Sequence, residues 1–477
     1  AFYGLRSLIL TLVFAALVGE CRAEGLTRIP PVAIGRLIGL DRAPEVKTIR
    51  RRMEALAGMG LCEQWLMALA RAHAGAHPEA MGILYVDGHV RAYHGGSDLP
   101  RAHLARARIA MAATTDSWLA DANGDAVLVW SSPPGAALTG ELKTAVASVR
   151  DLVGPDASAT IGFDRGGWSP KVFAELVGAG LDILTYRKGP LRPEPRSRFC
   201  AYQVTDRFGH THTCHLADRQ VRLAYDKRRR YFAARQVTRL DHASGHQTHI
   251  VTTRADLAVT DVATAMFSRW REENLSRFMR PRGLDAMDSY AKAPDDAGRM
   301  VPNPAKARAA KATKAAKAAL GAAKTAVIDA ALAGDDAPNA PIDEAEANLA
   351  AARAAAGAIP AKVRLGDIRP GAVRLDDERK RLHDAIRMAT WNAEATLARA
   401  LGPHYRRAED EAHSLLAETF SAPADMRVVG AELHVSIDAL SAPRRSRAIA
   451  ALCSELTATE TLYPGTNLRL VYDVKGC

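Results

Sequence analysis

The stretch ILYVDGH at residues 83–89 decides the fold that the sequence predicts. A run of apolar, β-branched and aromatic residues favours a buried strand, and a glycine directly after the aspartate lets the backbone turn away. We therefore expect a short strand that ends at Asp87 and leaves its carboxylate at the rim of a sheet. In the stretch ATIGFDRGG at residues 159–167, Asp164 likewise ends such a run, and a glycine follows within two residues. The two carboxylates are candidates to converge on one divalent cation, and Glu273 is the candidate for a third.

Strand and helix patterns alternate around these two stretches, from residue 81 to about residue 189. Residues 127–130 and 181–186 have the composition of buried strands. Residues 141–152 and 171–179 have helical spacing, and the second helix stops at a glycine. This alternation predicts an α/β core with a mixed sheet and flanking helices.

The charge of the chain favours a polyanionic partner. A net charge of +11 and a pI near 9.4 are typical of proteins that bind nucleic acid or an acidic membrane surface, although a generic basic protein rich in Ala and Arg stays open. The six cysteines form no CxxC pair and no disulfide-like framework, which predicts a reducing compartment. The spacing of Cys200, Cys214, His210, His212 and His215 matches no standard zinc module, so we favour a histidine-rich strand or loop there.

The amino-terminal region reads as helical. Residues 8–18 superficially resemble a secretory signal but are too few to span a membrane, and we expect a buried helix. No other stretch is a transmembrane candidate. The chain starts at Ala1 rather than at methionine, which is compatible with a fragment or an internal boundary. Residues 32–52 predict two short helices, either a helix-turn-helix with Lys47 and basic residues 50–52 on its second helix or a plain bundle with a basic surface.

An alanine- and lysine-rich segment covers residues 306–324, and an acidic one follows at 335–346. High alanine content favours helix, so a helical hairpin is expected. Lys311, Lys314 and Lys317 are spaced to share one face of it, and a solvated lysine surface is the alternative.

Residues 266–280 carry the third acidic motif on a predicted helix. Arg269, Glu273, Arg277 and Arg280 fall on one side at 3.6 residues per turn. A carboxylate framed by arginines suits a metal-bound phosphodiester, because the acid holds the cation and the guanidinium groups hold phosphate oxygens. An exposed helix with ordinary ion pairs is the alternative.

Taken together, the stretches YVDGH at 85–89, FDRGGWSP at 163–170 and RWREEN at 269–274 resemble the DDE transposases of bacterial insertion sequences. In the subgroup with a β-strand insertion before the last acid, the final helix carries a YREK signature. Arg269 and Glu273 fit its spacing, which selects Glu273 over the neighbouring glutamate. Met266 stands in the Tyr position and Arg280 in the Lys position, which puts ring-mediated and lysine-specific contacts in doubt.

The resemblance implies an RNase H-like core with a β-rich insertion, plus helical amino-terminal and helical or α+β carboxyl-terminal regions. The expected regions are 1–80 (helical, candidate DNA binding), 81–189 (first part of the catalytic core), 190–260 (β-rich insertion), 261–300 (final catalytic helix), 301–362 (Ala/Lys-rich helices) and 363–477 (helical and α+β).

The same resemblance implies that Asp87, Asp164 and Glu273 hold Mg2+, with Mn2+ as a substitute, for strand cleavage and strand transfer. The expected contacts to the DNA backbone are made by Arg165, Arg187, Lys188, Arg269 and Arg280. Trp168 is expected in the core, with stacking on an unpaired base as the alternative.

The implied partners are double-stranded DNA, as terminal inverted repeats and target, and a second copy in a homodimer on DNA, with no membrane. The expected location is the bacterial cytoplasm, at the nucleoid. A structure-selective nuclease and an inactive, truncated transposase that only binds DNA are the alternatives.

Overall fold

The computed structural model describes residues 3–96, 99–104, 107–155, 157–189, 191–205, 211–226, 230–268, 279–286, 292–333 and 339–477. The chain forms two compact units. Unit 1 comprises residues 1–96, 100–290 and 376–477, and unit 2 comprises residues 97–99 and 291–375. Along the sequence, the main part of unit 2 is therefore inserted between two segments of unit 1.

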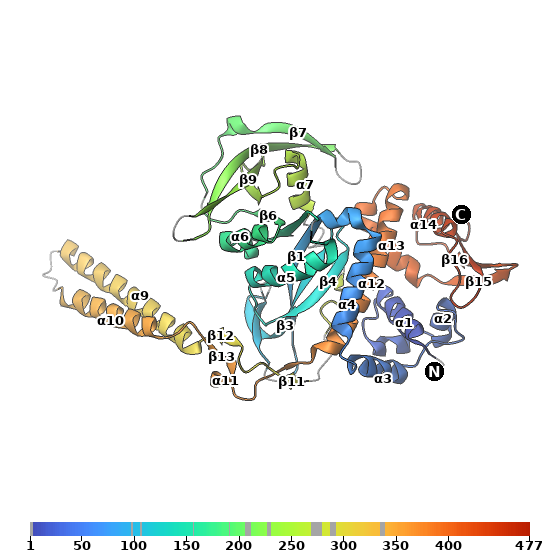
Figure 1. Ribbon diagram of the computed structural model, residues 1–477, viewed down its shortest axis with the longest axis horizontal. Helices are drawn as coiled ribbons and strands as arrows, with labels where there is room; N and C mark the ends of the chain where they lie inside the picture. The colour runs from blue at the N-terminus through green and yellow to red at the C-terminus, as the bar shows by residue number, and fades with distance from the viewer. Residues whose placement is uncertain are drawn as a thin grey trace. The chain divides into compact units, whose positions relative to one another are not determined.

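Unit 1 contains a ten-stranded mixed sheet, so the expected mixed α/β class is confirmed (Figure 1). Its first half has the strand order β4 (Ala126–Ser132), β3 (Ile109–Ala120), β1 (Ile83–Ala92), β5 (Ala159–Phe163) and β6 (Leu181–Tyr186). Strands β4, β3 and β1 are antiparallel neighbours, whereas β5 and β6 run parallel to β1. A short strand, β2 (Arg101–Leu104), also pairs with β3.

The second half of the sheet consists of strands that follow β6 in the sequence. Their order outward from β6 is β10 (Gln247–Thr252), β9 (Tyr231–Leu240), β8 (Thr211–Ala224) and β7 (Cys200–Thr205), and all neighbours are antiparallel. All four strands lie within residues 190–260, where we expected a β-rich insertion.

Two helices cover one face of the β1–β5–β6 layer. Leu84, Val86, Ile161 and Phe163 alternate along β1 and β5 and join one core cluster with α5 (Leu138–Val153) and α6 (Pro170–Gly178). Helix α6 begins where the Ser169 hydroxyl accepts the amide of Val172, with Pro170 in its first turn. On the opposite face, α7 (Val259–Ser268) packs with β6, β9 and β10.

Helices from both ends of the chain complete unit 1. A second core joins α1 (Leu5–Leu17), α2 (Pro31–Leu37), α3 (Val46–Ala57), α4 (Cys62–Ala76) and α12 (Asp377–Leu401). The buried helix expected at 8–18 is thus confirmed as α1. Residues 38–45 connect α2 to α3, and this connection is longer than the three- or four-residue turn of a helix-turn-helix.

The carboxyl-terminal part is a small α+β assembly with its own core. It contains α13 (Ala408–Ser421), β15 (Ala424–Val429), β16 (Glu432–Ile437), α14 (Pro443–Ala458) and β17 (Arg469–Val474). Short 3-10 helices lie at Ala23–Arg28, Pro78–Gly82, Arg165–Gly167, Arg196–Arg198 and Gly402–His404.

Unit 2 is a helical hairpin on a base of short strands. The hairpin is formed by α9 (Pro304–Ala333) and α10 (Ala340–Ala358). The base contains β11 (Lys292–Pro294) paired with β14 (Val373–Leu375), β12 (Met300–Pro302) paired with β13 (Lys362–Arg364), and α11 (Leu365–Ile368).

One expected strand boundary is wrong. Strand β1 does not end at Asp87 but continues to Ala92. Its pairing with β5 ends at Val86, whereas its antiparallel pairing with β3 continues from Gly88 to Ala92. The backbone of β1 therefore separates from β5 at Asp87, while its pairing with β3 keeps it extended.

Candidate functional site

The parallel pairing of β1 with β5 brings Asp87 and Asp164 together. The last register pair is Val86 with Phe163, so the two aspartates follow at the same level of adjacent strands. Neighbouring strands lie about 4.8 Å apart. Both aspartates are half-buried, and carboxylate oxygens are the ligands that divalent cations such as Mg2+ take. The two strand-end carboxylates singled out from the sequence are thus brought side by side.

Both aspartates lie on the face of the sheet that α7 covers. Side chains alternate along a strand, so Asp87 shares its face with Tyr85, and Asp164 shares its face with Gly162, which is the register partner of Tyr85. The Tyr85 ring lies directly on Gly162, where a Cβ atom would stand 2.4 Å from Tyr85 Cδ1. The Tyr85 hydroxyl then donates to the Ala265 carbonyl in α7 at 2.7 Å. The end of α7 is thereby fixed to the aspartate face.

The Asp164 carboxylate also shapes its own turn. Its Oδ1 atom accepts the Gly166 amide at 2.7 Å and caps the 3-10 helix that follows β5. A Cβ atom on Gly166 would stand 2.8 Å from Asp164 Oδ1, so this glycine allows the close approach. Gly166 therefore allows the turn that we expected after this aspartate.

His89 continues the same face of β1 two residues beyond Asp87. Its Nε2 atom lies 2.8 Å from Asp285 Oδ1, and Arg280 Nε lies 3.3 Å from Asp285 Oδ2. The hydrogen bond from His89 holds the pKa of Asp285 below its usual range, so the carboxylate stays charged. The chain that returns after residue 278 is thus anchored next to Asp87.

The other expected residues of the final helix, Arg269 and Glu273, lie outside the described residues. Arg280 is described and is partly buried in its pairing with Asp285. Ala265 in α7 and Asp285 both bond to side chains of β1. These two residues, one before and one after positions 269–278 in the sequence, are thus held at the strand that carries Asp87.

Of the expected DNA-contacting residues near the strand ends, two are exposed and one is engaged within the protein. Arg165 and Lys188 are exposed, and the Arg165 guanidinium carbon lies 5.7 Å from the ring centroid of Tyr186. Arg187 is half-buried and donates to Gln236, and burial lowers the pKa of its guanidinium. Arg165 and Lys188 are thus the two of these three cations that are open to a ligand.

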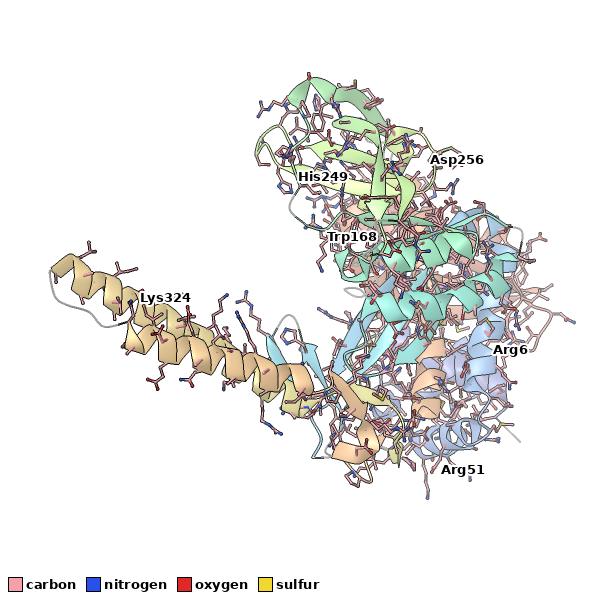
Figure 2. The ribbon with its side chains drawn as sticks, turned by 60° about the vertical axis from the view of Figure 1, so that its left-hand side comes forward. Arg6, Arg51, Trp168, His249, Asp256 and Lys324 are labelled. Atoms are coloured by element: carbon pink, nitrogen blue, oxygen red, sulfur yellow. The ribbon has the colours of Figure 1, made fainter. Side chains whose placement is uncertain are left out.

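Trp168, expected in the core, is partly buried at its edge. It packs against Phe173 edge to face, with ring centroids 5.2 Å apart, and borders the core cluster beneath α5 and α6. Figure 2 labels this side chain in the body of unit 1.

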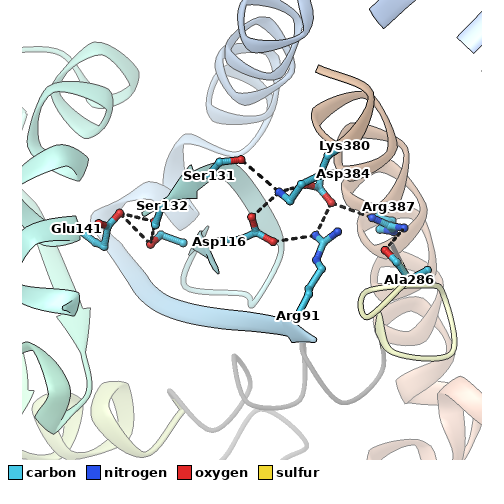
Figure 3. A network of polar contacts seen from close by, with 10 residues as sticks. Arg91, Asp116, Ser131, Ser132, Glu141, Ala286, Lys380, Asp384 and Arg387 are labelled. Atoms are coloured by element: carbon cyan, nitrogen blue, oxygen red, sulfur yellow. Dashed lines mark hydrogen bonds and ion pairs between the residues drawn. The ribbon is translucent and has the colours of Figure 1, made fainter. Parts of the chain in front are cut away.

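A buried ionic cluster lies further along the same face of β1 (Figure 3). Arg91 bonds to Asp116 of β3 at 3.0 Å and to Asp384 of α12 at 2.6 Å. Lys380 bonds to both carboxylates, and Arg387 bonds to Asp384 at 2.9 Å. All five side chains are at most 4% exposed. Burial alone raises the pKa of Asp384, but the three cations outweigh it and hold the pKa far below the usual range.

Sequence reasoning missed His89, Arg91, Asp116 and Asp285. A signal for two of them was present, because Asp87, His89 and Arg91 alternate with small or apolar residues at the period of a strand. Their partners are distant in sequence: Arg91 and Asp384 are separated by 293 positions. A single sequence gives no means to pair them.

A separate polar group lies between α4 and the turn after β3. Among the described residues, His73, Asp121 and Asp125 form the one set of potential cation ligands close enough to share an ion. Their atoms are already engaged: His73 bonds to Asp121 at 2.9 Å, and Arg399 bonds to both oxygens of Asp125 at 2.7 Å. Asp121 Oδ1 also accepts the amides of Asn123 and Asp125. This group stabilises the turn and holds α12 against it.

A family model described as "Transposase protein" matches residues 1–333 and 367–476. The unmatched stretch between these ranges contains α10. No curated protein sequence matches the chain. Within the described ranges, none of the helices combines the length and apolar character that crossing a membrane requires.

Proposed function

The chain belongs to this transposase family, and we propose that it is a DDE transposase that cleaves and joins DNA strands with the help of Mg2+. The observation that carries the proposal is the register of β1 and β5, which sets Asp87 beside Asp164 on one face of the sheet. We further propose that Glu273 completes the site.

The topology of the first half of the sheet supports an RNase H-like core. Three antiparallel strands are followed by two strands parallel to the first, with order β4-β3-β1-β5-β6 and helices α5 and α6 in the two crossovers. An RNase H-like core requires this sequence of directions and crossovers. The strands β7 to β10 then stand between β6 and α7, in the place of a β-strand insertion before the last acid.

Three observations support Glu273 as the third acid. The end of α7 is bonded to Tyr85, and Asp285 is bonded to His89, so both flanks of residues 269–278 attach to the aspartate face. Tyr186, at the level of Asp164 on β6, also directs its hydroxyl to the Met266 carbonyl at 3.5 Å. Within the segment, the spacing of Arg269 and Glu273 matches the final-helix signature.

The donor set fits Mg2+. Asp87, Asp164 and Glu273 offer only carboxylate oxygens, which Mg2+ prefers, and two of them stand on adjacent strands. When bound, the metal ions would activate the attacking hydroxyl and stabilise the leaving oxygen of a phosphodiester. The protein's own part is to hold the carboxylates and to position DNA, with Arg165 and Lys188 as exposed cations near the strand ends. We also propose that the protein acts as a homodimer that holds two DNA ends together.

A cleavage and joining assay tests this function. Purified protein is incubated with labelled DNA from an element end, Mg2+ or Mn2+, and a target plasmid. We expect joined product from the native chain and loss of both cleavage and joining, with DNA binding retained, in Asp87→Asn, Asp164→Asn and Glu273→Gln. Asp182→Asn is the matched control, because Asp182 is near the opposite end of β6 and bonds to Thr253.

The outcomes separate the alternatives. Cleavage without joining identifies a nuclease, and binding without cleavage identifies a protein that has lost its chemistry. Cleavage retained by Asp164→Asn rules out the proposed metal site.

A further inference from the structure

The α9–α10 hairpin of unit 2 is an antiparallel pair of helices with a mostly apolar seam that is partly covered between them. The less exposed positions recur at intervals of three and four residues on both helices. On α9 they are Ala309, Thr313, Ala316, Leu320, Ala323, Val327 and Ala330, and on α10 they are Ile342, Ala345, Leu349, Ala352 and Ala356. At 1.5 Å per residue, α9 is about 45 Å long. The outward faces of this arm are therefore not needed for its folding.

Charges are sorted along the hairpin. From residue 304 to residue 324, every charged side chain is a lysine or arginine. The Thr313 hydroxyl bonds to the Ala352 carbonyl at 3.2 Å, which places this basic half beside residues 347–358, where Arg353 is the one charged residue. The acidic residues Asp343, Glu344 and Glu346 gather on the other half of α10. One half of the arm is thus uniformly basic.

Four cations of this half form what we call the basic face of α9: Arg308, Lys311, Lys314 and Lys317. All four are exposed, and none forms an ion pair or hydrogen bond with another residue of the described ranges. The cations that flank them differ, because Lys306 donates to the Ala356 carbonyl and Lys324 pairs with Glu346 at 2.8 Å. Figure 2 shows Lys324 on the hairpin.

The spacing of the basic face suits a polyanion. Its members recur every three residues, so neighbours lie about 4.5 Å apart along the axis and are turned by about 60° from one another. The set therefore spans about 13.5 Å and winds over about half of the circumference of α9. Double-stranded DNA carries one phosphate charge per about 1.7 Å of its axis, so such a track meets several phosphates. The residues between the cations are alanine and threonine, which offer little with which to read base edges.

We propose that the basic face of α9 binds the phosphate backbone of double-stranded DNA without reading its sequence. Lysine ammonium groups act as point charges on phosphate, and such contacts position a protein on DNA rather than specify a site. The inference shares with the proposed function the premise that DNA is the partner, but it does not depend on the metal-binding acids.

The test measures how DNA affinity depends on salt. The full chain and its Lys311→Gln, Lys314→Gln, Lys317→Gln triple variant are titrated with fluorescein-labelled duplexes of two unrelated sequences between 50 and 200 mM NaCl. Each phosphate contact contributes about 0.9 to the slope of log affinity against log salt, so the triple variant should lose about 2.7. The native chain should then lose about 40-fold more affinity than the variant over this salt interval, equally on both duplexes.

Matched variants keep the test decisive. Glutamine has a helix propensity close to that of lysine, so circular dichroism should show unchanged helix content. The control triple variant, Arg427→Gln, Arg444→Gln and Arg447→Gln, removes three exposed cations of unit 1 and should keep the native slope. Asp164→Asn should also keep the native slope even when cleavage is lost, which separates this inference from the proposed function.

An unchanged slope in the Lys triple variant overturns the inference, and so does an equal loss of slope in the control. Sedimentation of the free proteins tests the alternative partner, which is a second copy of the chain. Self-association that the Lys triple variant abolishes, together with an unchanged slope, would assign the basic face to the acidic half of a second copy.

Discussion

Removing the charge of Asp384 should destabilise unit 1 strongly. Asp384 accepts from Arg91 at 2.6 Å, from Arg387 at 2.9 Å and from Lys380 at 2.9 Å, and all four side chains are buried. Among the described residues, the cluster with Asp116 holds three cations and two carboxylates. Asp384→Asn keeps the shape but removes one negative charge from beside the three buried cations. Breaking a buried pair from one side costs about 3–5 kcal/mol, and we expect a loss of that size.

Urea unfolding followed by tryptophan fluorescence measures this loss. All six tryptophans lie in segments of unit 1, so the signal reports on that unit alone. Asp41→Asn is the control, because Asp41 is exposed and such surface changes stay within about 0.5 kcal/mol. A loss below about 1 kcal/mol in Asp384→Asn would refute the reasoning, since it would mean that the cluster does not need this carboxylate.

Two further predictions concern Glu394 and Gly162. Burial raises the pKa of Glu394, but hydrogen bonds from His413 and Arg282 lower it more, so its stabilisation is present above the unfolded pKa of about 4.3 and is lost as pH falls. The free energy of unfolding should therefore fall less between pH 7 and pH 3 in Glu394→Gln than in the native chain, and equal losses in pH-dependent denaturation would contradict this. Gly162→Ala should cost about 1–3 kcal/mol, because its Cβ atom meets the Tyr85 ring at 2.4 Å; an unchanged urea midpoint would show that the ring moves without cost.

The sequence predicted best those strands whose own residues specify burial. Strand β5 runs from Ala159 to Phe163 and β6 from Leu181 to Tyr186, close to the predicted limits. Both lie inside the sheet and most of their residues are buried, so the apolar signal is nearly continuous along the chain. The pairing of Asp87 with Asp164 followed from the same pattern, since each aspartate directly succeeds such a run.

Strand β3 could not be predicted in this way. Residues 109–120 are largely Ala, Thr and Ser, with Asp116 fully buried in the middle. An aspartate in a buried strand is unfavourable until Arg91 and Lys380 neutralise it, and Lys380 comes from a helix far along the chain. Buried Asp116 is stabilised by tertiary contacts, so the strand propensity of residues 109–120 does not predict β3.

The same limit applies to the continuation of β1 and to the polar residues beyond Asp87. Gly88 indicates a turn when it is read alone, yet pairing with Ser117 of β3 keeps it extended. His89 is hydrogen-bonded to Asp285, which lies 196 positions away in the sequence. The sequence therefore identified the carboxylates of the candidate site, while their surroundings depend on contacts across the fold.

The ionic cluster also has a consequence for how the protein is made. Arg91 and Asp116 are synthesised early, but their partners on α12 follow only after the whole of unit 2. Until α12 emerges from the ribosome, the β1–β3 pair presents uncovered charges that water or a chaperone must accommodate. Conversely, a protease cut between α9 and α10 in the finished protein should leave the two fragments joined, because buried charge pairs and a shared core hold α12 in unit 1.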